Sequence, residues 1–169
     1  MAGPQTKFHA ESACAAPARE VWKLLYDPVR FSRWWPGWER IEPGEGSALT
    51  HYDARWPDFA YPATVSSEPS TGRVVVSCLL SDIVHTWSID PAGGGCQISV
   101  EVTIPVAEAD RAADAADVVR QALAALVSEA EAALEAMPGA GSYQSGLRDS
   151  SQAPTGAGHA PRSGRRHDL

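Results

Sequence analysis

Alternating apolar and polar residues through the middle of the chain predict β-strands. Between residues 96 and 105, the apolar side chains at even positions from 98 to 104 alternate with polar ones, as in an antiparallel sheet with one covered face. The Gly- and Pro-rich segment 90–96 predicts a hairpin turn before this strand. The strands that we expect cover residues 7–15, 47–56, 61–69, 72–80, 83–90 and 96–105.

A helical period replaces this alternation near the end of the chain. Residues 108–137 contain twelve alanines, and alanine is the best helix former. Their apolar stripe recurs every three or four residues. Upstream of that stripe the same face carries mainly alanine, which fills little volume and predicts space beneath the helix. The stripe consists of Val119, Leu123, Leu126, Ala130, Leu134 and Met137.

The order of these elements predicts an α+β fold. A first strand is followed by two short helices, about six further strands and one long helix, which is typical of a helix packed on an antiparallel sheet. After Pro138 the sequence is dominated by Gly, Pro, Ser and Ala, a composition too poor in large apolar residues to form a core. We therefore expect a flexible N-terminus over 1–6, one domain over 7–137 and a disordered tail over 138–169.

Charge and composition narrow the classes of partner. The chain has a net charge of −7, and residues 1–137 alone carry 10 basic and 19 acidic side chains. Such an acidic body repels phosphate backbones, so we expect no nucleic-acid binding. No apolar run is long enough to span a membrane, and the first residues lack a signal peptide's apolar core, so we expect a cytoplasmic protein. The three cysteines have no metal-binding spacing and predict buried free thiols.

Residues 13–44, "ACAAPAREVWKLLYDPVRFSRWWPGWERIEPG", resemble the opening of the START-like, Bet v 1-like superfamily, and within it the polyketide cyclase/dehydratase group. The later hairpin "HTWSIDPAGGGCQISVEVTI" and the long last helix extend the resemblance to about 7–137. It implies a helix-grip fold, in which a curved antiparallel sheet of about seven strands wraps a long C-terminal helix around a cavity. The matching positions are Ala16-Pro17, Val21-Trp22, Asp27-Pro28, Phe31, Trp34-Trp35, Pro36-Gly37 and Trp38.

Three functions remain open under this resemblance. The first is a small cyclase or dehydratase that closes or dehydrates an aromatic or polyketide-type molecule without a cofactor, as in antibiotic biosynthesis. The second is a non-catalytic carrier or sensor of a hydrophobic ligand, similar to lipid-transfer modules. Polar groups converging inside the cavity favour the enzyme, an entirely apolar lining favours the carrier, and a filled core with an exposed apolar patch would instead favour an interaction protein.

The tryptophans are the first candidates for ligand contact. The resemblance places Trp34, Trp35, Trp38 and Trp56 around the mouth and floor of the cavity, although one of the adjacent pair must point away from it. Aromatic walls suit a flat, apolar ligand. The other residues that we expect to contact ligand are His51, Trp87, Val119 and Leu123.

Few residues could carry catalysis. His85 shares a strand phase with Trp87 on the covered face, where it is either a general acid or base or a structural histidine bonded to a backbone carbonyl. Tyr61 could supply a hydroxyl group to the cavity. Cys78 lies in a Val-rich strand and is expected to be a buried, inert thiol. No His or Cys spacing indicates a metal site.

The segment 47–56 leaves its orientation open. One phase carries Leu49, His51, Asp53 and Arg55, and the other carries Tyr52 and Trp56. A charged phase more commonly faces water. If it faces inward instead, the Asp53–Arg55 pair could hold an oxygen-rich ligand or polarise a carbonyl group.

Overall fold

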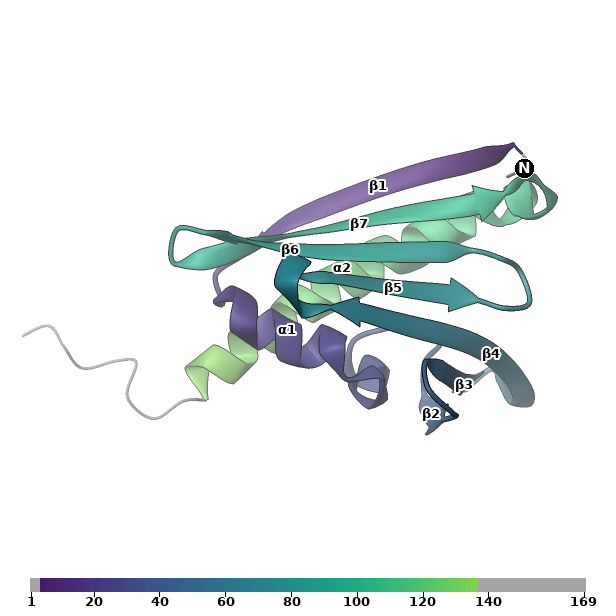
Figure 1. Ribbon diagram of the computed structural model, residues 1–169, viewed down its shortest axis with the longest axis horizontal. Coiled ribbons are helices and arrows are strands. Elements are labelled where there is room, and N and C mark those ends of the chain that lie inside the picture. The colour runs from purple at the N-terminus through teal and green to yellow at the C-terminus, as the bar shows by residue number, and fades with distance from the viewer. Residues whose placement is uncertain (1–3, 137–169) are drawn as a thin grey trace, which may run out of the picture.

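The computed structural model describes residues 4–136, which form one curved antiparallel sheet packed on helices (Figure 1). The seven strands pair in the order β1-β7-β6-β5-β4-β3-β2, so the first strand forms one edge of the sheet and pairs with the last strand. The predicted fold class, an α+β helix-grip arrangement, is confirmed. The strands are β1 (Gln5–Cys14), β2 (Arg40–Pro43), β3 (Ala48–Asp53), β4 (Trp56–Glu68), β5 (Arg73–Cys78), β6 (Val84–Ala92) and β7 (Gly95–Pro105).

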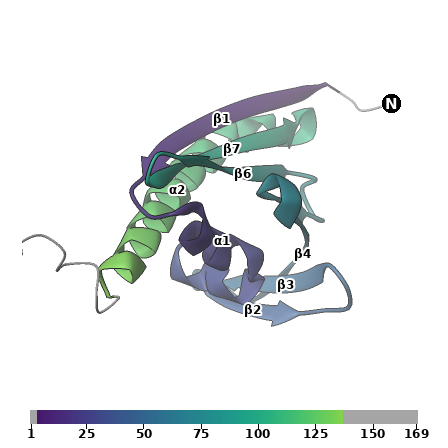
Figure 2. The same cartoon turned by 60° about the vertical axis from the view of Figure 1, so that its left-hand side comes forward.

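Two α-helices lie against the sheet. The short α1 (Ala18–Tyr26) and the long α2 (Ala112–Glu135) contact one another, and the sheet curls around α2 (Figure 2). Three short 3₁₀ helices, η1 (Pro28–Arg33), η2 (Pro69–Thr71) and η3 (Val106–Arg111), make connections. No helix among residues 4–136 is long and apolar enough to cross a membrane.

The first strand and the long helix begin at slightly different residues from those predicted. β1 begins at Gln5, where it pairs with Pro105, two residues earlier than the expected start at position 7. The long α-helix begins at Ala112 rather than at 108, because the chain first turns through η3 directly after Pro105. Met137 and the expected tail over 138–169 lie outside the described residues.

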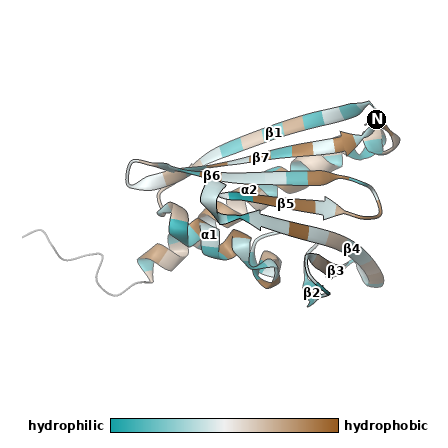
Figure 3. Ribbon diagram, in the orientation of Figure 1, coloured by the Kyte–Doolittle hydropathy of each residue, from teal (hydrophilic) through white to brown (hydrophobic). Residues whose placement is uncertain are grey.

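The core lies between the inner face of the sheet and α2. The four even-numbered apolar residues of β7 from 98 to 104 are each at most 1% exposed, so the alternation predicted for this strand is confirmed. Brown apolar segments interrupt the teal along β5, β6 and β7 in Figure 3. From α2, the fully buried Val119, Ala122 and Leu126 pack against this layer. Burial of this apolar surface is the main term that stabilises the fold.

A two-residue hairpin turn joins β6 to β7. Ala92 at the end of β6 pairs with Gly95 at the start of β7, and Gly93 has a φ of +58° in the turn. A side chain at Gly95 would collide with the Cys14 carbonyl oxygen, only 2.1 Å from the position of its Cβ. The glycines of segment 90–96 therefore make both the predicted turn and the close approach of β1.

Candidate functional site

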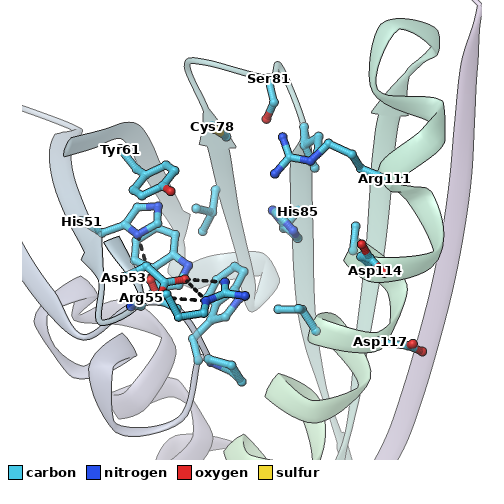
Figure 4. Close-up of a pocket in the computed structure, with 18 residues that line it drawn as sticks. His51, Asp53, Arg55, Tyr61, Cys78, Ser81, His85, Arg111, Asp114 and Asp117 are labelled. Atoms are coloured by element: carbon cyan, nitrogen blue, oxygen red, sulfur yellow. Dashed lines mark hydrogen bonds and ion pairs between the residues drawn. The ribbon is translucent and has the colours of Figure 1, made fainter. Parts of the chain in front are cut away.

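A cavity of about 610 Å³ lies between the inner face of the sheet and the first turns of α2 (Figure 4). One wall is aromatic and comes from the segment after η1 together with β3 and β4. The opposite wall comes from η3 and α2, and the β5 and β6 strands supply the surface between them. The residues that line the cavity include Trp35, Gly37, Trp38, His51, Asp53, Arg55, Tyr61, Cys78, His85, Arg111, Asp114, Ala115, Asp117 and Val118.

The aromatic wall begins with the tryptophans after η1. The Asp27 carboxylate accepts a hydrogen bond from the Val29 backbone N–H at 3.2 Å and so caps this short helix. Trp34, Trp35 and Trp38 follow as a stack, with ring centroids 5.2 Å and 5.0 Å apart in succession. Only Trp35 and Trp38 line the cavity.

Trp34 points away from the cavity. It is 2% exposed, and its Nε1 donates a hydrogen bond to the Leu24 carbonyl oxygen at 3.3 Å, which ties the aromatic segment to α1. The expectation that one of the adjacent tryptophans would serve as packing therefore describes Trp34, and Trp35 is the one that faces the cavity.

Four other residues expected to contact ligand do not line the cavity. Trp87, Val119 and Leu123 are buried in the core, where they contact other protein atoms. Trp56 follows the β3–β4 turn and is 62% exposed, so it forms neither the mouth nor the floor. Sequence phase predicted that these side chains would be apolar contacts, but it could not tell packed core from cavity wall.

The space beneath α2 is narrower than the sequence predicted. Ala122 is fully buried against the core, whereas Ala115 and Val118 line the cavity. The empty volume therefore lies only under the first turns of the helix. Farther along, Ala122 belongs to the packed hydrophobic core and does not line this cavity.

The charged phase of β3 faces inward. Leu49 and Asp53 are buried and His51 lines the cavity, whereas Tyr52 lies outside, with its hydroxyl 3.2 Å from the Glu42 carboxylate and the Arg40 guanidinium over its ring. The commoner arrangement, with the charged phase in water, is therefore wrong for this strand.

Arg55 makes this inward arrangement possible. It lies in the two-residue turn after β3, and its backbone N–H donates to Asp53 Oδ1 at 2.8 Å while its guanidinium Nε donates at 3.0 Å. These bonds hold the pKa of the Asp53 carboxyl below its usual value, and Asp53 is only 8% exposed. A buried carboxylate is stable only when paired in this way. Figure 4 shows the pair beside the aromatic wall.

Two histidines line the cavity, one on each side of this pair. His51 lies on β3, and its Nδ1 is 3.2 Å from the Gly37 carbonyl oxygen. Burial is the main cause of the lowered pKa of His51, and Gly37 and Asp53 oppose it. His85 lies on β6, with its ring edge-on to Trp35 and their centroids 5.0 Å apart.

His85 is the more strongly perturbed of the two. Burial lowers its pKa to about 4, and the backbone of Val76 directly across the ladder opposes this shift only weakly. Nδ1 is buried and makes no hydrogen bond of normal geometry with any described residue. The interaction with the Val76 backbone is of the kind that a structural histidine makes, and with a pKa of about 4 the ring is neutral at physiological pH.

The sequence did not identify the wall contributed by η3 and α2. Arg111, Asp114 and Asp117 line the cavity, although none of them was among the residues expected there. Their spacing with Val118, at three- and four-residue steps, was the available signal. Arg111 donates to Glu108 at 3.0 Å and Arg120 donates to Asp117 at 2.8 Å, so most of this charge is already paired.

Cys78 also lines the cavity and is half-buried, so the expectation of a thiol buried in the core was wrong for this residue. Cys14 and Cys96 are buried, as predicted. Within residues 4–136 no group of three or more His, Cys, Asp and Glu side chains is placed to hold a metal ion. The polar groups of the cavity can exchange protons and donate hydrogen bonds.

Comparison with known proteins agrees with this geometry. Residues 5–136 match a family described as polyketide cyclase/dehydrase and lipid transport. No curated protein matches the sequence.

Several solved structures share the fold at low identity. The Zhui aromatase/cyclase from Streptomyces sp. R1128 is 17% identical, with a TM-score of 0.63 over 79% of this chain and 98% of that one. Ara h 8.0201 is 15% identical, with a TM-score of 0.61 over 76% and 99%. The di-domain aromatase/cyclase StfQ from the steffimycin biosynthetic pathway is 11% identical, with a TM-score of 0.62 over 78% and 52%. These likenesses concern the fold.

Proposed function

Because this chain belongs to the polyketide cyclase/dehydrase and lipid transport family, as the resemblance in its opening residues predicted, we propose that its cavity binds a hydrophobic, aromatic or polyketide-type molecule and catalyses its cofactor-free cyclisation or dehydration. The observation that carries the proposal is the composition of the cavity. Trp35 and Trp38 form a flat apolar wall, and hydrogen-bonding groups from three strands and a turn face the same space of about 610 Å³. This volume is in the usual range for small-molecule sites.

The aromatic wall would supply orientation. A flexible chain held against Trp35 and Trp38 loses the freedom that makes ring closure slow in water, so that proximity alone lowers the barrier. Dehydration and ring closure both develop negative charge on a carbonyl oxygen. Arg55 and Tyr61 would stabilise that charge with hydrogen bonds, while Asp53 orients the Arg55 guanidinium.

His85 would exchange a proton with the bound molecule. Its ring is neutral at physiological pH and faces the cavity opposite the Arg55 side. A neutral imidazole can accept a proton as a general base and then return it as an imidazolium acid. The solved structures named as aromatase/cyclases support this reading at the level of fold, and the polar lining distinguishes it from a purely apolar carrier site.

Tryptophan fluorescence tests the binding half of the proposal. We expect a flat aromatic polyketide to quench the fluorescence saturably, and Trp35→Ala to weaken that binding at least tenfold. Trp56→Ala is the matched control, because Trp56 is exposed and away from the cavity. Saturable binding without conversion of any such compound would leave the carrier function, and absence of saturable quenching would contradict the ligand site.

A further inference from the structure

The ring of His51 stacks on two aromatic side chains of the cavity wall. It lies flat against Trp38, with centroids 3.8 Å apart and planes 9° from parallel. On its other face lies Tyr61, 5.1 Å away and 19° from parallel. The two aromatic rings fix the plane of the imidazole, so that its nitrogens can point only along the wall or into the cavity.

The Gly37 carbonyl oxygen decides which nitrogen carries the proton. It lies 3.2 Å from His51 Nδ1, and a carbonyl oxygen only accepts hydrogen bonds, so Nδ1 must be the protonated nitrogen. A neutral imidazole protonated at Nδ1 carries its lone pair on Nε2. No described residue hydrogen-bonds to Nε2, and this atom is not sealed from solvent.

The surroundings keep this ring neutral. Burial is the largest cause of the lowered pKa of His51, and the nearby Asp53 charge opposes it only in part because Arg55 neutralises that carboxylate. The other titratable group packed against the ring is Tyr61 on β4. Across the cavity lie His85 on β6, Arg111 on η3 and Asp114 on α2.

We propose that His51 is the general base of the cavity and removes a proton from a carbon atom beside a carbonyl group of a flat, apolar substrate. The proton passes to Nε2, the carbon–hydrogen electron pair forms the enolate, and the negative charge develops on the carbonyl oxygen. The hydrogen-bond donors of the cavity, Arg55 and Tyr61, then have a defined partner. Return of the proton from the imidazolium restores the base, so the step needs no cofactor.

This inference rests on the proposed function and assigns its first proton transfer to a residue that the sequence had suggested only as a ligand contact. His85 is the competing base within the same cavity. The Val76 backbone also interacts with the His85 ring, but the buried Nδ1 makes no hydrogen bond of normal geometry with any described residue, so the tautomer of His85 is set less firmly. At His51 the backbone makes that selection before any substrate binds.

Proton exchange in 2-tetralone, a flat aromatic ketone, tests the assignment. In heavy water we expect the protein to accelerate deuterium uptake beside the carbonyl group, as measured by NMR. His51→Gln should lower the protein-catalysed rate by about 100-fold or more, the usual share of general acid–base catalysis, while His9→Gln should leave it unchanged. His9 is exposed on the outer face of β1 and makes a proper control.

The pH profile and a binding measurement separate the outcomes. Because the neutral ring is the active form and its pKa is lowered from 6.5, the wild-type rate should fall on acidification only below about pH 6.5. Two results would contradict the assignment of His51 as the base but not the existence of the binding site. The first is saturable quenching by 2-tetralone together with full exchange activity in His51→Gln. The second is loss of exchange in His85→Gln alone. Absence of quenching would overturn both proposals.

A measurement on the wild-type protein covers a variant that fails to fold. Nitrogen-15 NMR of the histidine rings at neutral pH should show His51 with a protonated Nδ1 and an unprotonated Nε2. The opposite tautomer, or a ring still charged at pH 7, would remove the lone pair on which the proposal depends.

Discussion

Gly37 lies so close to the Asp53 carboxylate that a side-chain carbon at position 37 would stand 3.1 Å from Oδ2. The glycine also has a φ of +85°, a conformation that other residues adopt only at a cost. One residue therefore admits the buried ion pair on one side and presents its carbonyl oxygen to His51 on the other. The Pro36-Gly37 turn connects Trp35 and Trp38 within the aromatic wall.

Substitution of this glycine should destabilise both features. We expect Gly37→Ala to lower the free energy of unfolding by about 1–2 kcal/mol for its backbone conformation, with a further loss from crowding of Asp53. Gly46→Ala is the matched control, since Gly46 has a φ of +61° but nothing within 4 Å of the new side chain. Urea unfolding of both variants measures the difference, and equal losses would show that Asp53 moves aside freely.

Two alanines of α2 should respond differently to enlargement. Ala122 is fully buried, so Ala122→Leu should overpack the core and cost about 1–3 kcal/mol. Ala115 lines the cavity, so Ala115→Leu should be closer to wild type in stability and should weaken binding of aromatic ligands by filling their space. Thermal unfolding and fluorescence quenching test the pair. A larger loss of stability at Ala115 would contradict the position of the cavity under α2.

The loss of stability on truncating a residue in the apolar stripe of α2 should depend on how deeply that residue is buried. Leu126 is fully buried, and Leu126→Ala should lower the free energy of unfolding by roughly 2–5 kcal/mol. Leu134, two turns later, is only half-buried, and Leu134→Ala should cost clearly less. Denaturant unfolding of the two variants provides the comparison. Similar losses would mean that the end of the helix is packed more tightly than its exposure indicates.

Acid should destabilise the fold through His85. Its pKa is about 4 in the folded protein and 6.5 in the reference state, so the unfolded chain binds the proton more tightly. The contribution of the neutral ring to stability is complete above about pH 6.5. It is lost as the pH falls from there toward 4, by up to about 3 kcal/mol at 1.36 kcal/mol per pKa unit.

Urea unfolding across this range of pH tests the effect. His51, whose pKa is also lowered, adds a loss of the same sign in wild type. His85→Gln should therefore reduce the slope of stability against pH between 6.5 and 4 without removing it completely. An identical slope in wild type and His85→Gln would show that the ring is not buried as a neutral base.

Local pattern was enough to predict the strands and the long helix. The alternation in β7, with Ile98 and Val102 buried and Glu101 exposed, follows directly from the two-residue period of a strand. The inward position of His85 followed in the same way from its phase with Trp87. Phase is a property of consecutive residues, so one strand suffices to read it wherever one face is clearly apolar.

Where both faces of a strand carry polar and apolar residues, the sequence alone does not determine which face is buried. In β3 the inward face carries Asp53, and that orientation is stable only because Arg55 folds back from the turn to neutralise the carboxylate. This pairing depends on turn geometry and on the register shift between His51 and Asp53, neither of which is encoded in hydropathy. The prediction from frequency, with the charged face in water, was therefore wrong.

The sequence by itself determined the family, the helix-grip fold and the presence of an aromatic segment after the first helix. Only the tertiary structure decided which aromatic and alanine residues bound a cavity. Trp34 and Trp35 are neighbours of one chemical type, yet one bonds to Leu24 in the core and the other faces the open space. A cavity is the volume left when distant elements meet, and its borders depend on how α2 diverges from the curved sheet. The separation of these elements cannot be predicted from the local periodicity of the sequence.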